Sequence, residues 1–137
     1  MPFTIDPQLA ADTVPLGDFA LSHVRLMNER HYPWLVLVPM RIGIRELIEL
    51  TPFEQAALTT EIDRASRALT ALFHPDKLNI GAIGNIVSQL HVHIVARFRA
   101  DPAWPKPVWG AAPREAYDAG ALAERTAALR SALRLGP

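Results

Sequence analysis

Two histidines separated by one residue, His91 and His93, are the side chains of this sequence best suited to chemistry. Imidazole changes charge near neutral pH, so a pair can divide nucleophilic or basic work from acidic or anion-binding work. The residues around the pair alternate between polar and apolar types. Such alternation is typical of a β-strand, whether functional or simply packed on one face and wet on the other. The strand is predicted to carry Gln89, His91, His93, Val95 and Arg97 on one face, and Leu90, Val92, Ile94, Ala96 and Phe98 on the other.

The run from Gln89 to Val95 resembles the signature of the histidine triad superfamily, His-φ-His-φ-His-φ-φ, in which φ is apolar. Here the run reads Q-L-H-V-H-I-V, so Gln89 stands where the family has its first triad histidine. The resemblance extends over about residues 19–105. Its further matches are Gly84-Asn85, where the family has a phosphate-cradling loop, Arg97, the apolar run 34–39 and the Trp104-Pro105 pair.

This resemblance implies a nucleotide hydrolase or nucleotidyl transferase. His91 would attack the α-phosphate of a nucleotide ester, anhydride or phosphoramidate and form a nucleotidyl-histidine that water resolves. In the family, the backbone carbonyl of the first triad residue holds Nδ1 of this histidine and leaves Nε2 free. Gln89 is expected to keep that backbone bond while its carboxamide takes the network position of an imidazole. His93 is expected to donate to a phosphate oxygen.

Other residues are expected to bind the phosphate or the ribose by the same resemblance. The backbone amides that follow Gly84, including that of Asn85, would form the phosphate cradle. Ile86 stands where many members have Ser or Thr, so only its amide could serve. Asn28 is expected to contact ribose or phosphate, through an alignment that requires a gap. Arg97 is expected to add a cation to the same face.

Two other functions remain open at this point. One is a nucleotide-binding module that has lost turnover, which the departures at Gln89 and Ile86 favour. The retained His91 and His93 oppose it. The other is a metal-dependent hydrolase, because His-x-His on a strand can supply two zinc ligands. A third ligand is not evident, so we expect neither a metal nor a cofactor; the remaining histidines, in other predicted elements, are His23, His31 and His74.

Helices and strands must position these side chains. Thr51, Pro52 and Glu54 form the start of the clearest helix, with an N-cap, a proline in the first turn and a capping box. Its apolar stripe is Leu58, Ile62, Ala65, Leu69 and Leu72, and it stops at His74-Pro75-Asp76. A short first helix is predicted after Asp6-Pro7 and an alanine-rich one over about 118–134. Strands are predicted over 19–27, 34–39 and 77–83.

The order of these elements predicts an α+β fold, with a meander of antiparallel strands and helices on one side. Residues 1–137 are expected to form one domain. Residues 101–110 are rich in proline and predict an extended loop, in which Trp104 and Trp109 either pin the loop or line the ligand pocket. The family resemblance further implies a homodimer whose two sheets join into one.

The amino-acid composition limits the classes of partner and the cellular location that we expect for this protein. Lys and Arg total 14, as do Asp and Glu, so the formal net charge is zero and a nucleic-acid partner is not expected. The sequence has no cysteine, which fits a cytoplasmic protein and excludes thiolate metal sites. Neither a signal peptide nor a membrane span is visible. The expected partner is a nucleotide substrate.

Overall fold

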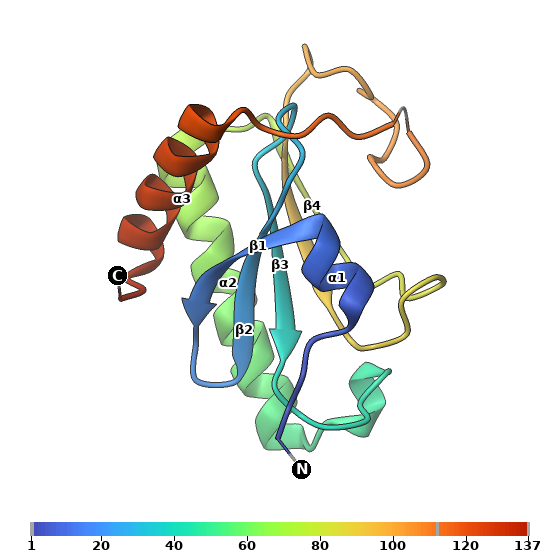
Figure 1. Ribbon diagram of the computed structural model, residues 1–137. Helices are drawn as coiled ribbons and strands as arrows, with labels where there is room; N and C mark the ends of the chain where they lie inside the picture. Colours follow the sequence, from blue (N-terminus) through green and yellow to red (C-terminus); the bar gives the residue numbers. More distant parts are fainter. Residues whose placement is uncertain (1, 112, 137) are drawn as a thin grey trace.

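The computed structural model describes residues 2–111 and 113–136. Its centre is an antiparallel sheet with the strand order β1-β2-β3-β5-β4. Helices α2 and α3 cover one face of this sheet, and α1 lies over the opposite face (Figure 1). The elements are α1 (Pro7–Asp12), β1 (Thr13–Asp18), β2 (Ser22–Met27), β3 (Trp34–Pro39), η1 (Leu47–Glu49), α2 (Pro52–Phe73), β4 (Lys77–Gly81), β5 (Val92–Arg97) and α3 (Ala119–Leu133). The α+β prediction is therefore confirmed, but the helices do not all lie on one side.

The long helix α2 begins as the sequence predicts. The hydroxyl of Thr51 accepts from the amide of Glu54, and the carboxylate of Glu54 accepts from the amide of Thr51. This reciprocal capping box satisfies two amides that a helix start leaves without partners. The helix ends at His74, which adopts a left-handed conformation with φ of 48°. Its buried residues pack on β3 and β5, so α2 supports the strands that carry the site.

Strand β1 and the short helix η1 are the elements that the sequence analysis does not predict. Local signals oppose β1. It contains Pro15 and Gly17, which normally indicate a break, and its register shifts between these two residues. The strand is possible because it lies at the edge of the sheet, where a proline removes no ladder hydrogen bond. The predicted strand over 19–27 is shorter in the structure, where it begins at Ser22.

Strand β5 lies inside the sheet, between β3 and β4. After β3, helix α2 crosses the sheet and the chain forms β4 at the edge. The next strand, β5, then pairs between β3 and β4. The last strands are therefore not side by side in chain order, as they would be in a simple meander. The predicted apolar row is buried from Leu90 to Ala96, with Ile94 and Ala96 fully inaccessible. The other row is buried from His91 to Arg97, because α1 and the loops that follow β5 cover it. The histidines therefore lie in a covered cleft rather than on a wet face.

Two apolar layers enclose the sheet. One packs α2 and α3 against residues such as Leu26, Leu35 and Ile94. The other lies beneath α1 and contains Leu9, Trp34 and Val95. Within the described residues, no helix has the length and apolar character needed to cross a membrane.

Candidate active site

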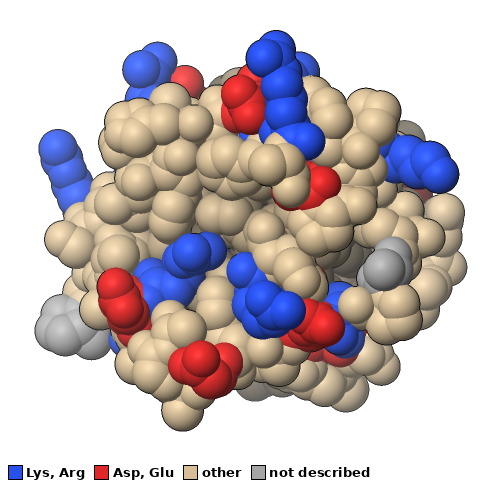
Figure 2. Space-filling model, turned by 90° about the horizontal axis from the view of Figure 1, so that it is seen from above, with Lys and Arg blue, Asp and Glu red and all other residues tan. Residues whose placement is uncertain are grey.

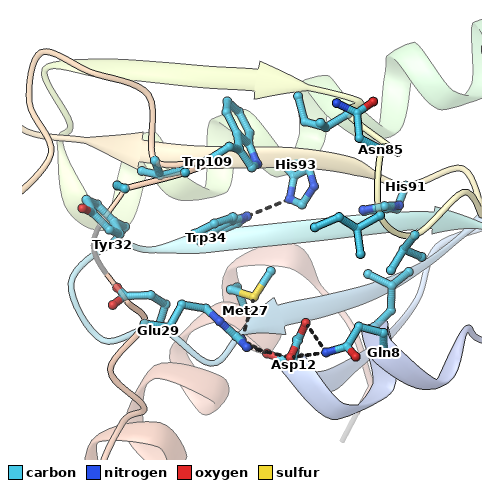
Figure 3. Close-up of a pocket in the computed structure, with 18 of the residues that line it drawn as sticks. Gln8, Asp12, Met27, Glu29, Tyr32, Trp34, Asn85, His91, His93 and Trp109 are labelled. Atoms are coloured by element: carbon cyan, nitrogen blue, oxygen red, sulfur yellow. Dashed lines mark hydrogen bonds and ion pairs between the residues drawn. The ribbon is translucent and has the colours of Figure 1, made fainter.

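A cavity of about 570 Å³ lies on the α1 side of the sheet. His91 and His93 both line it, and Figure 3 shows His93 next to His91 and beside the rings of Trp34 and Trp109. We call His91, His93 and Trp34 the sheet wall, because β5, its approach and β3 position them. We call α1 together with residues 108–111 and 113–114 the covering wall, because they line the cavity from outside the sheet.

His91 is held in one orientation by its own main chain. Its Nδ1 lies 2.7 Å from the backbone oxygen of Gln89. A carbonyl can only accept, so Nδ1 carries the proton and a neutral ring keeps its lone pair on Nε2. The side chain is 6% exposed and lines the cavity. This is the bond that the family resemblance predicts, and it leaves Nε2 with an unprotonated lone pair.

His93 is held in the opposite tautomer by Trp34. The indole Nε1 of Trp34 donates to Nδ1 of His93 at 2.9 Å. An indole N–H can only donate, so Nδ1 must be unprotonated, and a neutral ring then carries its proton on Nε2. Burial, and next the neighbouring His91, lower the pKa of His93 to about 3. His93 is therefore a neutral hydrogen-bond donor throughout the physiological pH range.

Aromatic rings surround this donor. Trp109 meets both His93 and Trp34 edge-on, with ring centroids 5.4 and 6.4 Å away. Its six-membered ring also packs over Gly81, where an added Cβ would lie 3.4 Å from it. The structure therefore places Trp109 in the lining of the cavity. Trp104 does not line the cavity. The guanidinium carbon of Arg97 lies 5.7 Å from the centroid of the Trp104 ring, and this contact holds the loop against the body of the protein.

The loop before β5 brings free amides to the cavity. Gly84 has φ of 70°, a left-handed conformation that favours glycine, and it lines the cavity with Asn85 and Ile86. The backbone N–H groups of these three residues donate to no acceptor among residues 2–111 and 113–136. Consecutive free amides on a turn form a concave anion site. Ile86 is 95% exposed and its side chain is apolar, so this residue could contribute to an anion site only through its backbone amide.

Three residues that the sequence analysis assigned to the site lie outside the cavity. The carboxamide oxygen of Asn28 accepts from the amide of Tyr117 at 3.0 Å. Arg97 is 1% exposed and pairs with Asp101 at 2.8 Å and with Asn79. The carboxamide of Gln89 is turned toward the N-terminal segment rather than toward the histidines. Their side chains bond to other parts of the chain, and none of the three lines the cavity.

The Arg97 pair shows why that cation is not available. Burial raises the pKa of Asp101, but hydrogen bonds from Arg97 and from the amides of Phe98 and Trp104 outweigh it and hold the pKa below its ordinary value. Asp101 is thus an anion that neutralises Arg97 inside the protein. Removing either partner would leave a buried unpaired charge.

Several lining residues were not found from the sequence. From α1 and β2 come Gln8, Asp12 and Met27, and from the segment after the motif comes Arg114 (Figure 3 labels the first three). Arg114 pairs with Asp12 at 2.6 Å, and Gln8 also donates to Asp12. No local signal marks these residues, because each reaches the cavity only through the fold. Trp34 could have been suspected, since an indole at the start of a buried strand needs a partner.

The His-x-His pair does not form a larger metal-binding cluster in the part of the chain that is described. Residues 2–111 and 113–136 contain no group of three His, Asp or Glu side chains placed to hold an ion. Both Nδ1 atoms of the pair are already hydrogen-bonded.

Comparisons with known proteins agree with this geometry. The HIT domain model matches residues 8–100. The AP-4-A phosphorylase of Mycobacterium tuberculosis (strain ATCC 25618 / H37Rv) is 32% identical over 111 residues, covering 73% of this chain and 55% of that protein. The chain thus spans about half the length of the curated relatives it matches.

Two solved structures are similar along nearly the whole chain. A histidine triad protein from Bradyrhizobium japonicum is 46% identical, with a TM-score of 0.94, covering 97% of this chain and 99% of that one. A histidine triad protein from Marinobacter aquaeolei VT8 is 42% identical, with a TM-score of 0.95, covering 99% and 100%. The HIT domain model matches residues 8–100, and the histidine pair lies at the start of β5, with His91 directly before the strand and His93 within it, so this chain belongs to the histidine triad (HIT) family.

Proposed function

We propose that this chain is a nucleotide hydrolase or nucleotidyl transferase that acts at an α-phosphate through a covalent bond to His91. The observation that carries this proposal is the pair of oppositely oriented imidazoles. One ring offers a lone pair at Nε2 and the other offers an N–H at Nε2, side by side in one cavity. A nucleophile next to a fixed donor is the arrangement that phosphoryl transfer needs.

In the first step, Nε2 of His91 attacks the α-phosphorus, and the bond from phosphorus to the leaving group breaks. The leaving group departs with the bonding electron pair and takes up a proton. The ring now carries positive charge, which the carbonyl of Gln89 stabilises through Nδ1–H. His93 and the amides of residues 84–86 hold the phosphoryl oxygens while their charge redistributes.

In the second step, an acceptor attacks the same phosphorus and the phosphorus–nitrogen bond breaks, so His91 regains its lone pair. Water as acceptor yields a nucleoside monophosphate and releases a proton, which makes the protein a hydrolase. Inorganic phosphate as acceptor yields a nucleoside diphosphate. The name of the mycobacterial relative, AP-4-A phosphorylase, is the reason to test phosphate as well as water.

We also propose that this chain is a variant of the histidine triad with Gln89 at the first triad position. Gln89 supplies the carbonyl that orients His91, and any residue type could do so. The reaction therefore does not require an imidazole at position 89. A module without turnover is the competing function, and it predicts binding without a covalent intermediate.

The charge distribution supports a small substrate rather than a nucleic acid strand. On the face shown in Figure 2, Lys and Arg side chains stand beside Asp and Glu side chains. A protein that follows a phosphate backbone usually gathers its cations on one face.

The test is a substrate panel combined with trapping of the intermediate. Dinucleoside polyphosphates, nucleoside phosphoramidates and nucleotide sugars labelled in the α-phosphate are mixed with enzyme, and the protein is denatured and digested. We expect label on the peptide that contains His91, stable in alkali and lost in acid, as a phosphorus–nitrogen bond requires. Binding of nucleoside monophosphate without label would instead establish a binding module.

Treatment with chelators distinguishes the covalent mechanism from a metal-dependent one. We expect turnover to survive exhaustive treatment with chelators, because the proposed steps use imidazoles and amides alone. Loss of turnover that zinc restores would replace the covalent mechanism by a metal-dependent one.

We further propose that two copies form a homodimer by joining their sheets. Strand β4 is an edge of the sheet, and Ile80 on it is 50% exposed. Edge strands with exposed apolar residues pair readily with another strand. Sedimentation of the wild type as a dimer and of Ile80→Lys as a monomer is the expected result.

A further inference from the structure

Gln89 uses its side chain to hold the N-terminal segment. Its Oε1 accepts from the amide of Asp6 at 2.8 Å, and its Nε2 donates to the carbonyl of Thr4 at 2.9 Å. These partners lie on either side of Ile5. A carboxamide carries an N–H and a C=O like the main chain, and here it bonds to the two residues that flank Ile5 as the N–H and C=O of one residue do in a parallel strand pair. Both polar atoms of the side chain are therefore engaged by the N-terminal segment.

The segment that Gln89 holds leads directly into α1. Asp6 is the N-cap of this helix and accepts from the amide of Gln8. The helix has six residues, which is too short to be stable without outside contacts. Leu9 of this helix is 3% exposed and packs into the apolar layer that also contains Trp34 and Val95. Ile5, which is partly buried, packs against the same layer. Gln89 thus anchors the start of an element that lines the cavity.

From this geometry we propose that Gln89 is a positioning residue: its carboxamide clips residues 4–6 to the motif loop and so places α1 as a wall of the nucleotide cavity. The proposal rests on the proposed function for the nature of the ligand. It assigns two separate roles to one residue. The main chain orients His91, and the side chain shapes the cavity.

An alternative role for the carboxamide is to replace the imidazole of the first triad histidine in proton transfer. The two roles predict different kinetics. A residue that shapes the cavity affects KM, whereas a proton relay affects kcat and the pH profile. Histidine at position 89 would restore the family motif but could not reproduce both bonds to the segment, because its two nitrogens are fixed on a rigid ring.

The experiment compares Gln89→Glu, Gln89→Ala and Gln89→His. Glutamate has nearly the same shape and can accept from Asp6, but it cannot donate to Thr4. The control is Gln55→Ala, because the Gln55 carboxamide also bonds to main-chain carbonyls, those of Leu47 and Leu50, away from the cavity. Hydrogen exchange of residues 4–12 is measured with nucleoside monophosphate affinity, kcat, KM and the pH profile.

We expect Gln89→Ala to raise KM and the monophosphate Kd by about five- to tenfold, as the loss of two ordinary hydrogen bonds allows. Gln89→Glu should have a smaller effect and Gln89→His one similar to Gln89→Ala. Exchange in residues 4–12 should accelerate while that of β5 stays slow, and kcat and the pH profile should not change. The control variant should behave as the wild type.

Two results would overturn the positioning role. One is unchanged exchange and affinity in Gln89→Ala. The other is a large gain in kcat or a shifted pH profile in Gln89→His, which would establish a relay. If the wild type turned over no nucleotide, the proposed enzyme function would fail, but exchange and monophosphate affinity would still decide what the Gln89 side chain does.

Discussion

The two walls of the cavity are built in different ways. The sheet wall consists of His91, His93 and Trp34, each at most 6% exposed and carried by or next to strands that are paired on both sides. The covering wall consists of α1, residues 108–111 and residues 113–114, which lie outside the sheet. Groups that react must keep their distances to within fractions of an ångström, and a central strand provides this. Groups that admit a ligand can open more easily.

Long-range side-chain bonds hold the covering wall together and tie the residue that follows it to the rest of the molecule. Arg114 pairs with Asp12, and so links its two halves. Glu29 has a buried carboxylate that accepts from the amide of Glu115 and from the ring of His31. The comparison therefore predicts that changes in the sheet wall affect the rate of the chemical step, whereas changes in the covering wall affect binding.

The largest effect is expected for His91→Ala. Turnover should fall by several orders of magnitude, since no other group replaces the nucleophile. Nucleoside monophosphate should still bind, because the free amides and the covering wall remain. Calorimetric titration and single-turnover kinetics measure both properties. His74→Asn is the control, since His74 lies at the end of α2 in a conformation that asparagine accepts. A wild-type rate in His91→Ala would disprove the covalent mechanism.

The next largest effect is expected for Trp34→Phe. This change removes the N–H that keeps Nδ1 of His93 unprotonated, so the ring can adopt the other tautomer and lose its donor at Nε2. We expect kcat to fall by about tenfold, less than the roughly hundredfold loss that follows removal of a transition-state donor, because the ring of His93 can still adopt the donating tautomer part of the time. Trp109→Phe is the matched comparison, because within the described residues its indole N–H has no hydrogen-bond partner. Its effect should fall on KM, and equal losses of kcat in both variants would argue against the tautomer role.

The buried imidazole of His93 also predicts a pH dependence of stability. Its pKa is about 3 in the folded protein against 6.5 as the ordinary value, so between these pH values the unfolded chain binds a proton that the folded one does not. The contribution is therefore present above pH 6.5 and is lost as the pH falls toward 3. The slope is up to about 1.4 kcal/mol per pH unit. Urea unfolding of wild type and His93→Gln from pH 4 to 7 measures it; parallel curves would contradict the assignment.

The smallest effect is expected in the covering wall, for Arg114→Ala. Its pair with Asp12 is partly exposed, and such pairs contribute little. We expect KM to rise by about two- to fivefold at low salt, within the range of such a pair, while kcat stays constant. Arg67→Ala removes a comparable pair with Asp63 on the exposed side of α2 and should change neither constant. A fall in kcat for Arg114→Ala would show that the two walls are not separable in function.

Local patterns in the sequence predicted the parts of the molecule that neighbouring residues decide. The alternation around His91 and His93 identified their common face, and Thr51 with Glu54 marked the start of α2. Both signals depend on residues within a few positions of each other, through strand geometry or a helix cap. Strand β1 was not predicted, because Pro15 normally indicates a break in a strand. The proline is tolerated only because β1 lies at the edge of the sheet.

Only the tertiary structure decided which polar groups meet in the cavity. Trp34 reaches His93 across 59 positions of sequence and Gln89 reaches Thr4 across 85, whereas Arg97, expected at the ligand, pairs with Asp101 four positions away. Sequence alone showed that a guanidinium and a carboxamide were present, but not whether a buried partner was nearer than the ligand. Strand register and the packing of α1 determine that, because a buried polar side chain takes the partner that the fold brings within hydrogen-bond distance.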